Sequence, residues 1–127
     1  MVEQISVLHL RETAYFDEDI LNGLSRDLGP GVAENILCRA LEDMAMRFSQ
    51  IRHDYADGNQ RALRKSVHAL IPIADQVGLP GLARTGRDVM ICIDRGDPVA
   101  IAATLARLLR CGEMAIACGE IGVDLSI

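Results

Sequence analysis

The helical pattern is clearest in residues 61–78, which read RALRKSVHALIPIADQVG. If each residue advances by about 100° around a helix axis, the apolar side chains of this stretch share one broad face. Those residues are Leu63, Val67, Leu70, Ala74 and Val77. The opposite face carries Arg61, Arg64, His68 and Asp75. The pattern predicts an amphipathic helix that packs against other helices and exposes His68 to solvent.

Two helices are expected before this segment. Asp17 is a suitable N-cap for a first helix, which Gly29-Pro30-Gly31 should end. Its apolar stripe consists of Ile20, Leu21, Leu24 and Leu28. A long helix should then run to about Ala56, with Asn59 as the N-cap of the helix over residues 60–77. The apolar seam of the long helix consists of Leu37, Leu41, Met44, Phe48, Ile51 and Tyr55.

Two more helices are expected after the turn at residues 78–81. One should run from about Leu82 to Asp94, and Asp97-Pro98 should start the last, which ends before Gly119. Residues 1–16 form an N-terminal extension with room for a short helix, and residues 119–127 form a C-terminal tail. We therefore expect one all-α domain over residues 1–127, an up-and-down four-helix bundle with an additional N-terminal helix.

Composition agrees with a single helical domain. The chain has 127 residues, of which 50% are hydrophobic, 24% charged and only 3% aromatic, which excludes intrinsic disorder and predicts an aliphatic core. A net charge of −5 argues against a nucleic-acid partner. Neither a signal peptide nor an apolar run of membrane-spanning length is evident, so we expect a cytoplasmic protein without a membrane partner.

The sulfur-containing residues show no spacing typical of a metal site or of a disulfide framework. The four cysteines are Cys38, Cys92, Cys111 and Cys118. Each lies in an apolar helical stretch, where a free cysteine behaves as a small hydrophobic residue. We expect all four, together with the five methionines, to belong to the core, and we expect no bound metal.

The segment from Tyr55 to Val89 resembles a histidine-containing phosphotransfer (HPt) domain. The resemblance rests on the Asp57-Gly58-Asn59 turn, on His68-Ala69-Leu70 in place of the family's His-x-Leu, and on three features farther along. These features are Ala74, Gln76 and the Gly78-Leu79 turn. Helix order extends the likeness over about residues 17–115. The family motif continues with lysine and glycine, where this chain has Ile71 and Pro72.

The resemblance implies a phosphorelay carrier rather than an enzyme with its own small-molecule substrate. His68 would accept a phosphoryl group from a receiver domain and return it to another, with Gln76, Lys65 and Arg64 in support. The docking surface for the partner would include Arg61, Ile71, Pro72 and Gly78. The expected partners are a response-regulator receiver domain, a hybrid histidine kinase, or both. The resemblance implies no cofactor on this chain, because Mg²⁺ belongs to the receiver. We also expect a monomer.

Two alternatives remain open on the sequence. The alternatives to a phosphorelay carrier are a pseudo-HPt module that docks on a receiver or kinase without phosphotransfer, and an unrelated helical-bundle interaction protein. Arg61, Arg64 and Lys65 also fit an ordinary solvated face. Pro72 lacks the N–H that would bond the carbonyl of His68, so we expect a kink or a break between these two residues.

Overall fold

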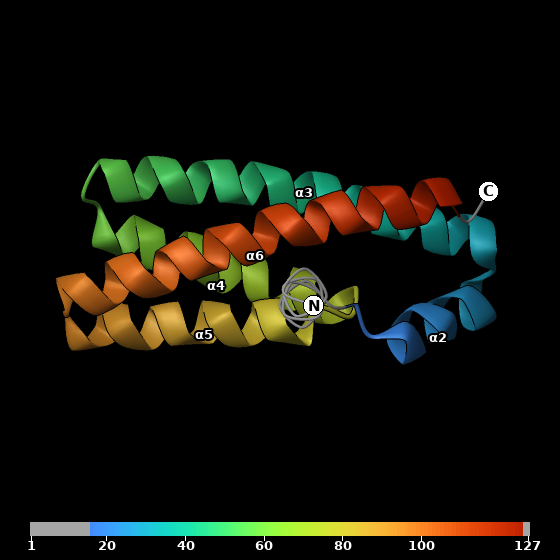
Figure 1. The fold of residues 1–127 in the computed structure, drawn as a ribbon, viewed down its shortest axis with the longest axis horizontal. Coiled ribbons are helices and arrows are strands. Elements are labelled where there is room, and N and C mark those ends of the chain that lie inside the picture. The colour runs from blue at the N-terminus through green and yellow to red at the C-terminus, as the bar shows by residue number, and fades with distance from the viewer. Residues whose placement is uncertain (1–15, 126–127) are drawn as a thin grey trace, which may run out of the picture.

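The protein is all-helical over the part that the structure, a computed structural model, describes. Residues 16–125 are described, with side chains up to residue 119, and they contain five helices and no strand (Figure 1). The helices are α2 (Glu18–Leu28), α3 (Pro30–Ala56), α4 (Gln60–Gln76), α5 (Pro80–Arg95) and α6 (Pro98–Leu125). The expected N-terminal extension lies outside the described residues, except for Phe16.

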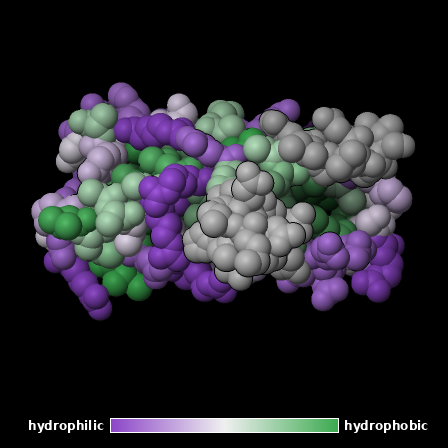
Figure 2. All heavy atoms as spheres, in the orientation of Figure 1, coloured by the Kyte–Doolittle hydropathy of each residue, from purple (hydrophilic) through white to green (hydrophobic). Residues whose placement is uncertain are grey.

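Helices α3 to α6 form a closed arrangement of neighbours. Each packs against the next along the chain, and α6 returns to pack against α3 (Figure 1). The long helices α3 and α6 extend beyond α4 and α5, and α2 lies against α3 at that end. The outer side chains over α2 are mostly hydrophilic (Figure 2). None of its residues is fully buried, and Ile20 and Leu28 of its apolar stripe are exposed.

Local capping signals confirm three of the expected helix starts. The Asp17 carboxylate accepts a hydrogen bond from the backbone N–H of Asp19 at 3.0 Å. Asn59 Oδ1 accepts one from the N–H of Ala62 at 3.0 Å, and Asp97 Oδ1 accepts one from the N–H of Val99 at 3.1 Å. Each bond satisfies a donor that the first turn of a helix otherwise leaves free.

The core is aliphatic apart from Phe48, as the composition predicts. The whole predicted apolar face of α4 is buried: Leu63, Val67, Leu70, Ala74 and Val77. Three residues expected in the core are exposed instead, because they point away from the neighbouring helices. Tyr55 and Met46 on α3 are 46% and 72% exposed, and Cys118 on α6 is exposed as well.

Two helix boundaries differ from the expectation. The fourth helix begins at Pro80 rather than near Leu82, because proline is well suited to the first helical position. The last helix continues through Gly119 to Leu125, so the expected tail is helical over most of its length. Gly119 is a packing residue: a Cβ atom there would lie 2.8 Å from Leu41 Cδ1 of α3.

The expected break at Pro72 is absent, because α4 is continuous from Gln60 to Gln76. Both Pro72 and His68 are exposed, so water can bond the carbonyl that loses its backbone partner. Over residues 16–125, no helix has the combined length and apolarity of a membrane span.

Candidate functional site

His68 lies in the middle of α4 and is exposed. Its exposure follows from helical periodicity, because Val67 and Leu70 beside it turn into the core and are at most 1% exposed. The backbone that carries the imidazole therefore belongs to a packed helix, while the ring itself is open to solvent. This arrangement confirms the predicted exposure of His68.

Two ion pairs between α4 and α5 frame the position of His68. Arg64 donates from Nε to Asp94 Oδ1 at 2.7 Å and from Nη2 to Asp94 Oδ2 at 3.0 Å. At the other end, Arg87 Nη2 donates to Asp75 Oδ2 at 3.0 Å. His68 lies between Arg64 and Asp75 along α4. The two pairs show which residues of α4 and α5 lie opposite each other on either side of the histidine.

The stretch of α5 between these ion pairs adds an apolar side chain. Ile91 falls between Arg87 and Asp94 in the sequence and is 47% exposed. Because α4 and α5 run antiparallel with the two ion pairs in register, Ile91 faces the same part of the surface as His68. Ile91 and the exposed Pro72 thus form a small apolar area around the His68 imidazole, and the two ion pairs place charges at either end of this area.

The bidentate pair also changes the ionisation of both partners. The hydrogen bond from Arg64 lowers the pKa of Asp94 below its ordinary value, and the same bond raises the pKa of Arg64. Both side chains are therefore ionised at neutral pH, and each offsets the charge of the other. Arg64, expected to support His68, thus has its charge engaged by Asp94.

Two residues expected on the docking surface are buried. Ile71 is 9% exposed, because the absence of a side chain at Gly86 of α5 leaves room for it. Gly78 is buried at the end of α4, where its φ of +77° continues the chain after the helix. Its carbonyl accepts a hydrogen bond from the N–H of Asp17 at 2.6 Å. Ile71 and Gly78 are therefore not part of the exposed surface around His68, contrary to the expectation.

The remaining predicted residues are exposed around α4. Arg61, Lys65 and Gln76 are all exposed, and none forms a side-chain hydrogen bond or ion pair with another described residue. Arg61 and Lys65 therefore present positive charge at the surface, on the side of His68 toward the start of α4. Gln76 lies two turns beyond His68, near the end of the helix.

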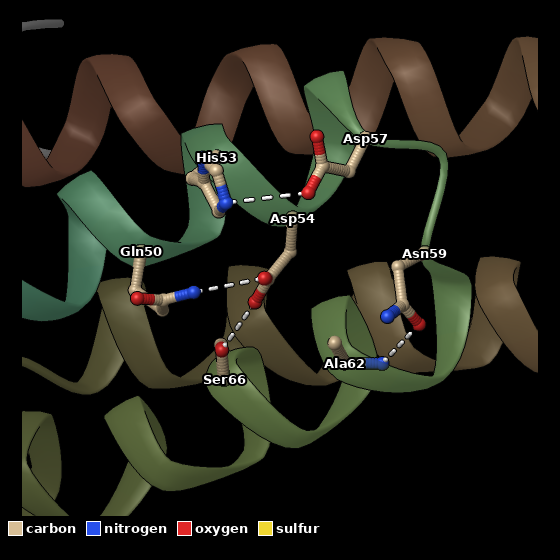
Figure 3. A network of polar contacts seen from close by, with 7 residues as sticks. All are labelled: Gln50, His53, Asp54, Asp57, Asn59, Ala62 and Ser66. Atoms are coloured by element: carbon tan, nitrogen blue, oxygen red, sulfur yellow. Dashed lines mark hydrogen bonds and ion pairs between the residues drawn. The ribbon is translucent and has the colours of Figure 1, made fainter.

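A polar network around the buried Asp54 joins α3 to α4 (Figure 3). Asp54 of α3 is only 6% exposed, and its carboxylate accepts hydrogen bonds from Gln50 Nε2 at 2.9 Å and Ser66 Oγ at 2.8 Å. Sequence reasoning missed this network. It also missed Asp94 and Gly86, since each meets α4 only through the packing of α5. For Asp54, one signal was available in the sequence: its position in the helical period places it near the inward face of α3.

The chemistry available at this surface is that of an exposed imidazole. Among the described residues, no group of histidine, cysteine and acidic side chains is arranged to hold a metal ion. Burial raises the pKa of the Cys111 thiol, which keeps it protonated and unreactive. Comparison with protein-family models, curated proteins and solved structures gives no match for this chain. The candidate site therefore stands on its own geometry.

Proposed function

We propose that the chain is a histidine phosphotransfer protein of the HPt kind, with a four-helix bundle built from α3 to α6. The observation that carries this proposal is the exposed His68 at the middle of a packed helix, between two interhelical ion pairs. A phosphoryl carrier needs an accessible imidazole on a rigid support and little further machinery of its own. The likeness of residues 55–89 to the HPt pattern agrees with this role.

The transfer would take place in the active site of a receiver domain. An unprotonated ring nitrogen of His68 attacks the phosphorus of the receiver's aspartyl phosphate. The new N–P bond forms as the P–O bond to the aspartate breaks, and the aspartate leaves as a carboxylate. Transfer to a second receiver reverses these steps. Mg²⁺ bound by the receiver supplies the charge stabilisation.

The surface around His68 suits such a partner. Pro72 and Ile91 provide exposed apolar contacts, whereas Arg61 and Lys65 provide cations for the acidic pocket of a receiver. The buried apolar faces of α4 and α5 hold the two helices together while a partner docks. Charges at the edge of an interface mainly affect the rate and specificity of association.

The direct test is the formation of phosphohistidine. The purified protein is treated with phosphoramidate or with phosphorylated receiver domains, and the adduct is followed by ³¹P NMR and intact mass. We expect one acid-labile, alkali-stable phosphoryl group, which is absent in His68→Gln. His53→Gln is the matched control, because His53 is also an exposed helical histidine but lies on α3. An adduct that persists in His68→Gln would contradict the proposal.

A second candidate function is favoured by one observation. Ile71, at the position of the family's lysine, is buried, so its side chain cannot contact a phosphoryl group on His68. A pseudo-HPt module would dock on a receiver or kinase through the same surface without transfer. In that case wild type and His68→Gln would bind a receiver with the same affinity, and neither form would become phosphorylated. A folded protein that neither binds a receiver nor accepts phosphate would instead be an unrelated helical interaction protein.

A further inference from the structure

The ion pair between Arg64 and Asp94 lies one helical turn from His68. Arg64 precedes His68 by four residues, so their Cβ atoms are about 5–6 Å apart on one face of α4. Helical side chains lean toward the N-terminus, so the His68 ring lies over the turn that begins at Arg64, while the resting Arg64 side chain leans onward in the same direction. Asp94 draws the guanidinium toward α5 through hydrogen bonds of 2.7 and 3.0 Å.

This pair can exchange partners. The side chains of Arg64 and Asp94 are 42% and 55% exposed, so water screens their attraction and the pair is weak. A phosphoryl group carries a charge of about −1.5 to −2 and three strong acceptor oxygens. An aspartate carries a single negative charge. If the guanidinium turns toward His68, it therefore favours the phosphoryl group, to which it can also bind in a bidentate manner.

The other cations nearby are less suited to this role. Arg87 pairs with Asp75 about two turns beyond His68 on α4, whereas Arg64 is only one turn from His68, so Arg87 is too distant for this role even without Asp75. Lys65 is exposed, but its ammonium group is a single point charge without the planar fork of arginine. Arg64 is thus the cation that combines the right spacing from His68 with bidentate geometry.

We propose that Asp94 controls the lifetime of the phosphoryl group on His68 by competing with it for Arg64. Before phosphorylation, Arg64 binds Asp94. After phosphorylation, Arg64 moves to the phosphoryl oxygens, and Asp94 becomes free on the surface of α5. The inference rests on the proposed phosphotransfer through His68. Arg64 is then the charge partner of the phosphoryl group, and Asp94 is a positioning residue that acts through Arg64.

The test measures the loss of phosphohistidine by ³¹P NMR at neutral pH and low salt, after labelling of the full chain with phosphoramidate. We expect Asp94→Asn to slow the loss at least threefold and Arg64→Gln to accelerate it at least threefold. Arg64→Lys should restore part of the lifetime. In the Arg64→Gln background, Asp94→Asn should have no effect, because Asp94 acts only through Arg64.

Two further variants separate this mechanism from a general effect of charge. Glu113→Gln removes the same charge from the interhelical pair with Arg52, where Nη2 and Oε1 are 2.6 Å apart, away from α4 and α5. Asp75→Asn removes the same charge from the ion pair with Arg87, at the other end of the site. Neither should reproduce the slowing seen with Asp94→Asn. In wild type, the Arg64 Nε–H resonance should shift on phosphorylation, and in Asp94→Asn the shift should be smaller.

The outcomes distinguish this inference from the function on which it rests. Equal loss rates in wild type and Asp94→Asn, or slowing that persists without Arg64, would overturn the exchange and leave the phosphotransfer intact. Equal slowing by Asp75→Asn would also overturn it, because the effect would then depend on net charge alone. If wild type forms no phosphohistidine, both proposals fail.

Discussion

Ile71 of α4 packs directly over Gly86 of α5, where an added Cβ atom would lie 3.1 Å from Ile71 Cγ1. The side chain at the position of the HPt lysine therefore belongs to the core rather than to the surface around His68. Its neighbour Pro72 is exposed, so the two departures from the family motif have different structural consequences. One fills the interface between two helices, and the other removes a backbone donor at the surface.

The first prediction is that Ile71→Lys does not repair the motif and instead weakens the fold. The position is only 9% exposed, so the lysine side chain would have to turn outward to keep its ammonium group in water. The contact with Gly86 would then be lost. We expect the free energy of unfolding to fall by about 2–4 kcal/mol in urea titrations. Ile71→Met keeps the apolar volume and should cost less than about 1.5 kcal/mol. Equal stability of wild type and Ile71→Lys would show that position 71 tolerates an exposed charge.

The second prediction concerns the proline within α4. Pro72→Ala restores a backbone N–H that can bond the carbonyl of His68, and it removes the steric conflict of the ring. We expect the free energy of unfolding to rise by about 1–3 kcal/mol, since interior proline costs about 3 kcal/mol in a helix. Thermal and urea unfolding provide the measurement.

The matched control for Pro72 is Pro80→Ala at the start of α5. Proline at the first helical position costs little, because that N–H has no intrahelical acceptor. Pro80→Ala should therefore leave stability nearly unchanged. A similar gain from both substitutions would mean that the position within the helix does not matter, which contradicts this account.

Local signals made most of the helices predictable from the sequence. Asp17, Asn59 and Asp97 cap helices through bonds that reach no more than three residues along the chain. The buried face of α4 follows equally from a periodicity of 3.6 residues. Such features depend on neighbours in the sequence, so an analysis of one segment at a time finds them. The exposure of His68 also follows from its neighbours in the sequence.

The parts that could not be predicted depend on contacts between distant segments. Arg64 and Asp94 are 30 residues apart, and nothing in either segment indicates that they pair. Gly119 looks like a helix end by composition, yet it allows α6 to approach Leu41 of α3. Ile71 looks like a surface position on α4 until Gly86 is known to lie opposite. In each case the packing of a second helix decides the role of the residue.

The third prediction tests the buried network around Asp54. Asp54→Ala leaves Gln50 Nε2 and Ser66 Oγ without their acceptor in a partly buried site, at a cost of about 1–3 kcal/mol in unfolding free energy. A double-mutant cycle with Ser66→Ala measures the bond between α3 and α4, and its coupling energy should be about 0.5–1.5 kcal/mol. Additive effects of the two substitutions would show that the bond contributes nothing. Asp57→Ala, on the exposed surface nearby, serves as the control.

The fourth prediction concerns the close approach of α3 and α6 at Gly112. A Cβ atom at this position would fall on the ring of Phe48, which is only 3% exposed and cannot swing outward. Alanine is favoured over glycine in a helix by about 1 kcal/mol, yet we expect Gly112→Ala to lose about 1–3 kcal/mol of unfolding free energy through overpacking. Gly31→Ala, with no atom within 4 Å of the new Cβ, should not be destabilising. In a Phe48→Leu background the ring is gone, so Gly112→Ala should cost much less there. If Gly112→Ala lowered the unfolding free energy by the same amount in that background, the strain would not arise from contact with Phe48.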